Sequence, residues 1–301
     1  MIALEFDKRD LSERKKIVEK FREKNLENRR KSKIKKIENW CKKYLSDVDG
    51  KCYNFHAVIE ALQEELLEIK EYLDSEYDVD TIMKELLCNK KNYIETTLYN
   101  RMHNEAKNIL LENLNVVVCP YCNRNYIFAD ENINTCELDH FIPKSRYPIF
   151  ASSFYNLIPS CPYCNGKKGD KDFKIYPHVT KKMPDELVRF TYNILGSNYL
   201  KKVDDLDIVL DVLDENYLTQ AKILRLEELY KHHKDIVQEI LKKREIFSDT
   251  YMKGLCEKFP NLFKTQEDIE ELVYGVSMKK NDYGKRPLSK MMHDIIEEVK
   301  V

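Results

Sequence analysis

The sequence predicts a mainly helical protein that carries a small, irregular α+β module near its middle. On both sides of residues 116–184, apolar residues recur three and four positions apart, the spacing of one helix face. Seven glycines and nine prolines are few for 301 residues, and this scarcity favours long helices over a turn-rich β fold. Inside 116–184 the helical spacing is lost and most of the prolines are found. We therefore expect helical regions at 1–115 and 185–301 around a module at 116–184.

The N-terminal region is expected to form helices over residues 8–45, 54–73 and 79–114. Its first helix is strongly basic, because the segment from Lys8 to Lys43 holds 16 Lys and Arg against 6 Asp and Glu. The net charge of the whole chain is only −1, since an acidic patch at 204–228 offsets this segment. The basic face is either a solvated helix surface or a binding surface for nucleic-acid phosphates or an acidic protein.

Short strands are expected at 116–118, 126–128 and 135–138, within the central module. The C-terminal region is expected to form helices over 217–247, 266–275 and 287–299. No apolar run approaches the ~20 residues of a membrane span. The first ten residues mix charged and apolar side chains, unlike a signal peptide. These features predict a cytoplasmic protein with no membrane contact.

The pentapeptide CPYCN occurs twice, at 119–123 and at 161–165. Together the copies give the spacing Cys-x2-Cys-x38-Cys-x2-Cys, and each Cys-x-x-Cys places two thiolates on one tight turn. Four thiolates make a closed structural zinc site with no open position for a substrate. A redox Cys-x-x-Cys is the alternative, but the chain lacks a thioredoxin-like βαβ context. The expected zinc ligands are Cys119, Cys122, Cys161 and Cys164.

The other five cysteines are scattered singly along the chain. In a reducing cytosol a disulfide framework is disfavoured, and free cysteine commonly packs as a small hydrophobe. We expect buried, inert thiols at Cys41, Cys52, Cys88, Cys136 and Cys256.

A second motif lies between and after the zinc cysteines. Residues 137–148 read ELDHFIPKSRYP, and residues 153–169 read SFYNLIPSCPYCNGKKG. The ordered series Asp139-His140, Asn156-Leu157 and then Asn165 resembles the HNH endonuclease motif. Asn165 stands where the final His of the motif would be, which is the HNN variant. The resemblance implies a ββα-metal fold that holds one catalytic divalent ion between a hairpin and a short helix.

The resemblance also implies a role for each side chain. His140 would be the general base, since an imidazole titrates near neutral pH. Asp139 and Asn165 would supply oxygen ligands, which suit Mg²⁺ or Mn²⁺ better than zinc. Asn156 would brace the loop and hold His140 in line. The expected phosphate contacts are Lys144, Arg146, Lys167 and Lys168.

A softer resemblance covers the C-terminal region. Residues 225–244 (RLEELYKHHKDIVQEILKKR) and 285–299 (KRPLSKMMHDIIEEV) look like the helical region of HNH proteins of the Septu type. Those are anti-phage defence nucleases encoded beside an SMC/ABC-like ATPase, and related proteins accompany some retrons. The likeness implies an ATPase partner that docks on the nuclease and restrains it. It does not cover the first 115 residues.

These features predict a metal-dependent endonuclease that hydrolyses phosphodiester bonds of nucleic acid, with DNA favoured over RNA. The alternative from another class is a non-catalytic zinc module that binds nucleic acid or scaffolds a complex. In that case Asp139, His140 and Asn165 would be dispensable. A cysteine-based redox or nucleophilic enzyme is the third interpretation, and it is disfavoured because the candidate thiols all have zinc spacing.

Overall fold

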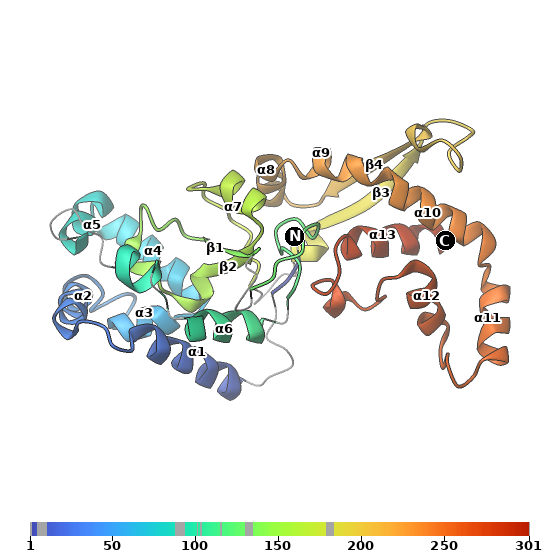
Figure 1. Cartoon of the computed structure of the whole chain (residues 1–301). Coiled ribbons are helices and arrows are strands. Elements are labelled where there is room, and N and C mark those ends of the chain that lie inside the picture. The colour runs from blue at the N-terminus through green and yellow to red at the C-terminus, as the bar shows by residue number, and fades with distance from the viewer. Residues whose placement is uncertain are drawn as a thin grey trace. The chain divides into compact units, whose positions relative to one another are not determined.

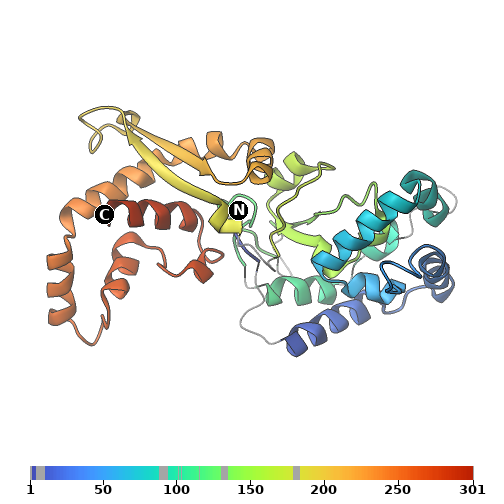
Figure 2. The same ribbon diagram turned by 180° about the vertical axis from the view of Figure 1, so that it is seen from behind.

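The computed structural model describes residues 2–4, 11–87, 94–100, 102, 104–114, 116–129, 135–178 and 184–300. These residues are largely helical and include two antiparallel sheets of two strands each (Figures 1 and 2). The predicted mainly helical class with a small α+β module is therefore confirmed. The chain divides into two compact units. Unit 1 comprises residues 1–3, 117–126 and 179–301, and unit 2 comprises residues 4–116 and 127–178.

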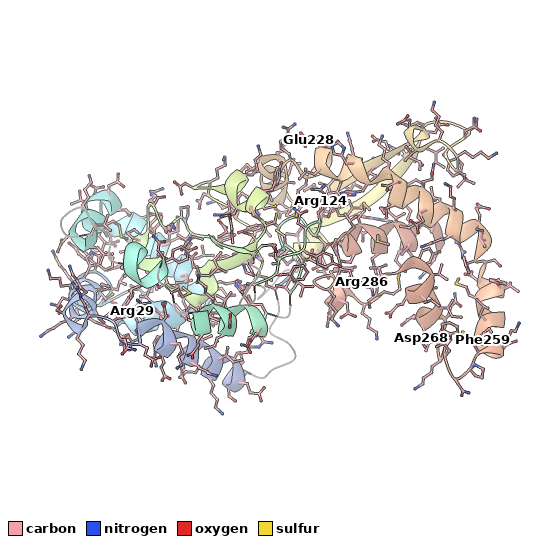
Figure 3. The ribbon with its side chains drawn as sticks, in the orientation of Figure 1. Arg29, Arg124, Glu228, Phe259, Asp268 and Arg286 are labelled. Atoms are coloured by element: carbon pink, nitrogen blue, oxygen red, sulfur yellow. The ribbon has the colours of Figure 1, made fainter. Side chains whose placement is uncertain are left out.

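Two predicted helices of unit 2 are each split in two. The segment 8–45 forms α1 (Leu11–Leu26) and α2 (Lys31–Tyr44), and the segment 54–73 forms α3 (Phe55–Glu60) and α4 (Gln63–Glu76). The first break contains Asn28 at a φ of 58°, a left-handed conformation that Asn tolerates and that ends a helix. Arg29 lies in the same turn (Figure 3). The second break lies at Ala61 and Leu62, whose backbones are extended.

The remaining helices of unit 2 are α5 (Val79–Leu87), the π-helical turn η1 (Ile94–Tyr99) and α6 (Asn104–Asn113). Helix α1 packs along α6 and α3, as both ribbon views show (Figures 1 and 2). The buried Phe21 of α1 meets Phe154 edge to face, with ring centroids 5.1 Å apart. The apolar face of the first helix therefore reaches the central module.

The central module contributes β1 (Glu137–His140), β2 (Leu157–Ser160) and α7 (Pro162–Lys168) to unit 2. The strand predicted at 135–138 corresponds to β1. The strands predicted at 116–118 and 126–128 are reduced to one isolated bridge between Val118 and Tyr126. Short 3-10 turns are η2 (Pro148–Phe150), η3 (Phe154–Asn156), η4 (Pro184–Leu187), η5 (Val203–Asp205), η6 (Lys231–His233) and η7 (Lys280–Asp282).

Unit 1 contains a β-hairpin that was not predicted. Strand β3 (Val188–Ile194) pairs antiparallel with β4 (Leu206–Val212), so that Phe190 lies opposite Leu210. The strands are rich in β-branched and aromatic residues, which is a strand signal that the helical expectation overlooked. The hairpin packs on the last helix, α13 (Ser289–Lys300), where the backbone N–H of Phe190 donates to Asp294 at 2.9 Å.

The predicted helix over 217–247 is divided into α8 (Glu215–Leu224), α9 (Leu226–Tyr230) and α10 (Lys234–Ile246). Arg225 ends α8 with a φ of 54°, which the surrounding sequence does not signal. Two further helices are α11 (Asp249–Lys258) and α12 (Gln266–Tyr274), which share a small apolar core of Met252, Phe263 and Ile269. Figure 3 marks Phe259 and Asp268 on this pair. No helix among the described residues is long and apolar enough to cross a membrane.

The single cysteines differ in their surroundings. Cys41 and Cys136 are buried as expected, and burial raises the pKa of both thiols. Cys52 is exposed, so the expectation of a buried thiol is wrong there. Cys256 is half-buried, and Cys88 lies outside the described residues.

His178 belongs to a cluster of aromatic rings in unit 2. The rings of Phe141 and Tyr176 lie 3.7 Å apart, and Tyr155 meets His178 edge to face at 5.3 Å. His178 is only 4% exposed, and burial lowers the pKa of its imidazole to about 4. The folded protein therefore keeps this imidazole neutral, whereas the unfolded chain protonates it near pH 6.5.

This difference predicts a loss of stability on acidification. The unfolded state binds a proton that the folded state excludes between about pH 6.5 and pH 4, so stability falls as the pH is lowered through that window. The shift corresponds to about 3 kcal/mol at ~1.4 kcal/mol per pKa unit. Thermal unfolding of His178→Gln between pH 7.5 and 4.5 should show a shallower dependence than the wild type. The exposed His56 provides the control, since His56→Gln should keep the wild-type slope.

Candidate active site and metal centre

Two strands and one short helix form a ββα arrangement at the centre of unit 2. Strand β1 pairs antiparallel with β2, and Asp139 lies opposite Ile158 while His140 lies opposite Leu157. All four residues of β2 are buried, so this strand anchors the hairpin in the core of unit 2. Helix α7 begins with Pro162, whose fixed φ suits the first turn, and packs back on β1. The arrangement brings the side chains of β1 and α7 together.

A buried ion pair joins α7 to β1. The Lys168 ammonium lies 3.3 Å from one oxygen of Asp139 and donates at 2.6 Å to the carbonyl oxygen of His140. Lys168 is fully buried and Asp139 is 3% exposed. Burial lowers the pKa of Lys168, and the neighbouring carboxylate of Asp139 opposes that shift. Lys168 was predicted as a phosphate contact, but it lies inside the site. Its contact with phosphate stays a prediction, and it would require the ammonium to leave Asp139.

His140 is held as a neutral imidazole. Its Nε2 lies 3.1 Å from the carbonyl oxygen of Ala151, and the side chain is almost completely buried. Burial first, and the nearby charge of Lys144 second, lower its pKa to about 3. Because a carbonyl oxygen only accepts, the Nε2 of a neutral ring must carry the hydrogen. The lone pair then lies on Nδ1, which is able to take a proton.

The side chain of Tyr99 packs against the His140 imidazole. Its ring meets that of His140 at a centroid distance of 4.3 Å and an interplanar angle of 65°. The Tyr99 hydroxyl donates to the carbonyl oxygen of Leu138 at 2.8 Å, and the Lys144 ammonium lies 4.3 Å from the Tyr99 ring centroid. Tyr99 was not predicted as a site residue, because it belongs to the N-terminal region and is not part of any recognisable motif.

Asn156 fixes the loop that connects the two strands. Its amide oxygen accepts from the backbone N–H of Ile142 at 2.7 Å. Its amide nitrogen donates to the carbonyl oxygens of Ile142 and Phe150 at 3.1 and 3.0 Å. The side chain is fully buried, so these three bonds replace water completely. The Asn156 amide therefore holds the loop at Ile142 and at Phe150. This loop contains Ala151, whose carbonyl oxygen contacts the His140 ring.

Asn165 faces a carboxylate that the sequence analysis also missed. Its Nδ2 donates to Glu137 at 2.6 Å, across from α7 to β1. Glu137 and Asp139 are two positions apart on a strand, so both lie on the same face. That alternation in the segment ELDH is the signal that could have identified Glu137. Asp139 and Asn165 stay predicted ligands of a divalent ion, and Glu137 adds a carboxylate of the kind that a hard cation prefers.

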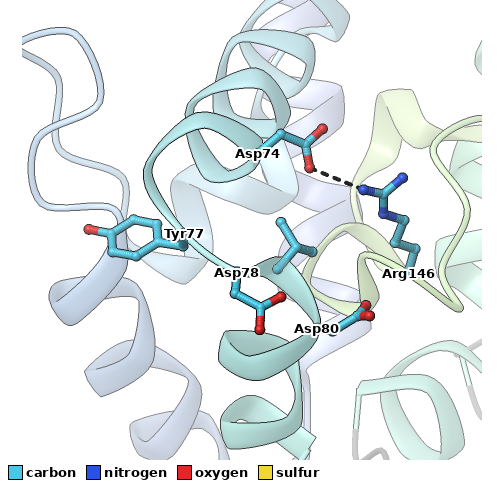
Figure 4. A pocket seen from close by; sticks show the side chains of 6 residues that line it. Asp74, Tyr77, Asp78, Asp80 and Arg146 are labelled. Carbon is cyan, nitrogen blue, oxygen red and sulfur yellow. Dashed lines mark ion pairs between the residues drawn. The ribbon is translucent and has the colours of Figure 1, made fainter.

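The other expected phosphate contacts lie at the surface of unit 2. Lys167 is exposed on α7, and Lys144 is half-buried against Tyr99. Arg146 is exposed and pairs with Asp74 of α4 at 3.6 Å (Figure 4). The same carboxylate accepts from the Tyr147 hydroxyl and pairs with Lys70.

Arg146 also borders a polar pocket of about 280 Å³. Figure 4 shows the carboxylates that surround it beside the Asp74–Arg146 ion pair. Its lining residues are Asp74, Tyr77, Asp78, Val79, Asp80 and Arg146. The aspartates outnumber the single arginine, so the pocket itself does not favour a phosphate.

Four buried cysteines form a separate cluster. The sulfur atoms of Cys119, Cys122, Cys161 and Cys164 all lie within 4.8 Å of one another, and none is in a disulfide. A tetrahedral zinc ion with ~2.3 Å bonds would place its sulfurs ~3.8 Å apart. The donor set, the spacing and the burial therefore fit a structural zinc ion, as predicted.

The two copies of CPYCN differ at their asparagines. Asn123 is buried at a φ of 49°, and its amide binds the backbone of Tyr283 and Lys290 at 2.8 and 3.0 Å. The neighbouring carbonyl of Cys122 accepts from the Tyr230 hydroxyl at 2.6 Å. Asn123 is thus a structural residue of unit 1, whereas Asn165 faces the carboxylates of β1.

The family of the central segment follows from comparison with known proteins. Residues 119–171 match the HNH endonuclease family model. This segment is an HNH endonuclease domain. It contains the zinc cysteines, both strands, α7 and every residue of the HNN series.

A curated relative extends the similarity. Septu protein PtuB of Bacillus thuringiensis is 36% identical over 111 residues, which cover 36% of this chain. The aligned part spans 40% of that relative, so less than half of its length is matched. The resemblance to HNH proteins of the Septu type is thereby confirmed for part of the chain. No solved structure matches this chain.

Loss of one zinc ligand should release the metal. We expect the purified protein to hold about one zinc ion per chain and Cys161→Ser to lose it, with a lower unfolding temperature, because zinc binding stabilises only the folded site. Elemental analysis and thermal unfolding measure both effects. Cys52→Ser, at an exposed cysteine outside the cluster, should change neither. A Cys161→Ser protein that keeps its full zinc content would rule out the four-cysteine site.

Proposed function

We propose that this protein is a metal-dependent endonuclease of anti-phage defence that cuts nucleic acid, with DNA preferred over RNA. The observation that carries the proposal is the ββα arrangement within the HNH-matching segment, which presents Asp139, His140 and Asn165 from facing elements. The likeness to Septu protein PtuB supports the defence role. We place the protein in the cytoplasm, and we keep 1–115, 116–184 and 185–301 as its proposed functional regions.

His140 serves as the general base. Its Nε2 hydrogen is held on the Ala151 carbonyl, so Nδ1 accepts a proton from the attacking water. The low pKa of the free site keeps the imidazole unprotonated, but it also makes a weak base. A bound phosphodiester brings negative charge close to the ring and raises its pKa toward the working pH. Substrate binding therefore makes His140 a stronger base for the cleavage step.

Asp139 and Asn165 hold the divalent ion, with Glu137 beside them. When bound, Mg²⁺ or Mn²⁺ supplies charge that polarises the scissile phosphate and stabilises the leaving oxygen. Asp139 shares its carboxylate with Lys168, so the ammonium weakens metal binding by competing for the same negative charge. Asn156 does not touch the reacting atoms and acts by holding the loop around His140.

Substrate affinity comes from surface cations of unit 2. Lys144, Arg146 and Lys167 contact phosphates near the cut bond. Helices α1 and α2 add a broad basic surface whose lysines and arginines neutralise phosphates further along the strand. Its exposed members are Lys15, Lys16, Lys20, Arg30, Lys31, Lys35, Lys36, Lys42 and Lys43.

The central prediction is that His140→Ala abolishes cleavage. With Mg²⁺ or Mn²⁺ present, the wild type should nick or linearise plasmid DNA, and His140→Ala should lower the rate at least ~100-fold, since general-base catalysis contributes about that much. The control is His56→Ala, which changes an exposed histidine and should leave the rate unchanged. Running labelled RNA in parallel decides the substrate.

The alternative function makes the opposite prediction. A non-catalytic zinc module would bind DNA without cutting it, and His140→Ala would change nothing. If the wild type, assayed with its partner, cleaves no nucleic acid yet retains DNA in a gel-shift experiment, the binding module is the correct interpretation.

We further propose that an ATPase of the SMC/ABC-like class binds and restrains this nuclease. A tagged copy expressed in its native host should co-purify with an ATPase, identified by mass spectrometry. His140→Ala should capture the same ATPase in equal amount, because docking does not require the catalytic base. Recovery of the nuclease without any ATPase, from cells that express both, would contradict the partnership.

A further inference from the structure

The loop between β1 and β2 is surrounded by side chains from the N-terminal half of unit 2. The Ser153 hydroxyl donates to the carbonyl of Val58 on α3 at 2.7 Å, and Phe21 of α1 packs on Phe154. Tyr147 hydrogen-bonds to Asp74 of α4. These contacts support the loop from outside.

Tyr99 differs from them because it reaches the site itself. It is half-buried, whereas Ile94 and Leu98 of the same helical turn are fully packed away from solvent. Its turn is π-helical, and such turns occur frequently at functional sites. Tyr99 therefore projects from a buried anchor towards β1.

Three contacts place the Tyr99 ring in the site. The hydroxyl is fixed to β1 through the Leu138 carbonyl, the ring meets that of His140 in a T-shaped contact, and the ring face lies beneath the Lys144 ammonium. The single hydrogen bond from Nε2 to Ala151 leaves the imidazole free to swing about that contact. The Tyr99 ring, packed against the imidazole, restricts this movement.

We propose that Tyr99 is a positioning residue for cleavage, whose ring fixes the His140 imidazole and holds Lys144 over the same site. The inference rests on the proposed nuclease function for its kinetic consequence. A general base acts only within hydrogen-bond reach of the water that it deprotonates, and a misplacement of about 1 Å costs about 100-fold in rate. The N-terminal region thereby becomes part of the catalytic apparatus.

Two substitutions separate the ring from the hydroxyl. Tyr99→Phe keeps both ring contacts and loses the hydroxyl with its bond to Leu138, so its kcat should stay within about threefold of the wild type. Tyr99→Leu removes the ring, and its kcat should fall about 100-fold. Its KM for DNA should rise no more than about threefold, since the basic surface of α1 and α2 remains. Tyr72→Leu removes another half-buried tyrosine of the same unit, which meets Tyr77 edge to face, and should change neither constant.

A spectroscopic measurement tests the same idea without catalysis. Nitrogen-15 NMR of the imidazoles at pH 7.5 should show His140 as a single tautomer with hydrogen on Nε2 in the wild type and in Tyr99→Phe. In Tyr99→Leu the hydrogen should stay on Nε2, because the bond to Ala151 remains, but the His140 signals should broaden as the ring moves between orientations. Zinc content and unfolding temperature, measured alongside, identify any variant that has lost its fold.

The outcomes are distinct. Wild-type kcat in Tyr99→Leu, or a loss in Tyr99→Phe equal to that in Tyr99→Leu, would overturn the role of the ring. His140 signals as sharp in a folded Tyr99→Leu protein as in the wild type would overturn it as well. A wild type that cuts nothing defeats the proposed function instead, and the NMR comparison still decides whether Tyr99 fixes His140.

Discussion

The ammonium of Lys168 holds the candidate site together. One buried nitrogen contacts Asp139 and the backbone carbonyl of His140, so it fixes the end of α7 against the end of β1. Burying a charge is costly unless it is paired and hydrogen-bonded, and the removal of either partner would leave the other charge unpaired. This ion pair therefore favours the observed packing of α7 on β1. Asn165 and Glu137 face each other as a consequence of that docking.

The HNH motif and the four-cysteine cluster could be recognised from the sequence because their signals are local. Adjacent residues Asp139 and His140 sit on one strand, and the two Cys-x-x-Cys turns announce a metal through spacing alone. Neither signal depends on how distant segments pack. The zinc cluster and the helical class were predicted for this reason, as was the HNH domain.

The remaining features depend on contacts between distant segments. Tyr99 lies about 40 positions before His140 and carries no pattern that marks it. Lys168 reads as a surface lysine beside Lys167, and only the packing of α7 on β1 turns it inward. The helix breaks at Asn28 and Arg225 use left-handed conformations that no glycine announces. The segments of the β3–β4 hairpin have a composition typical of strands, but they were assigned to the helical C-terminal region because the residues after them have helical spacing.

The β1–β2 loop is supported by α1, α3, α4 and η1, and this support limits how the HNH-matching segment could be transferred to another protein. A fragment cut to the HNH-matching segment would uncover Phe154 and Tyr147, together with the hydrogen-bonding groups that Val58 and Asp74 now satisfy. Exposed aromatic surface of that kind promotes aggregation. The HNH-matching segment is therefore not expected to fold well by itself. Recombination, whether natural or in the laboratory, must carry the N-terminal helices with it.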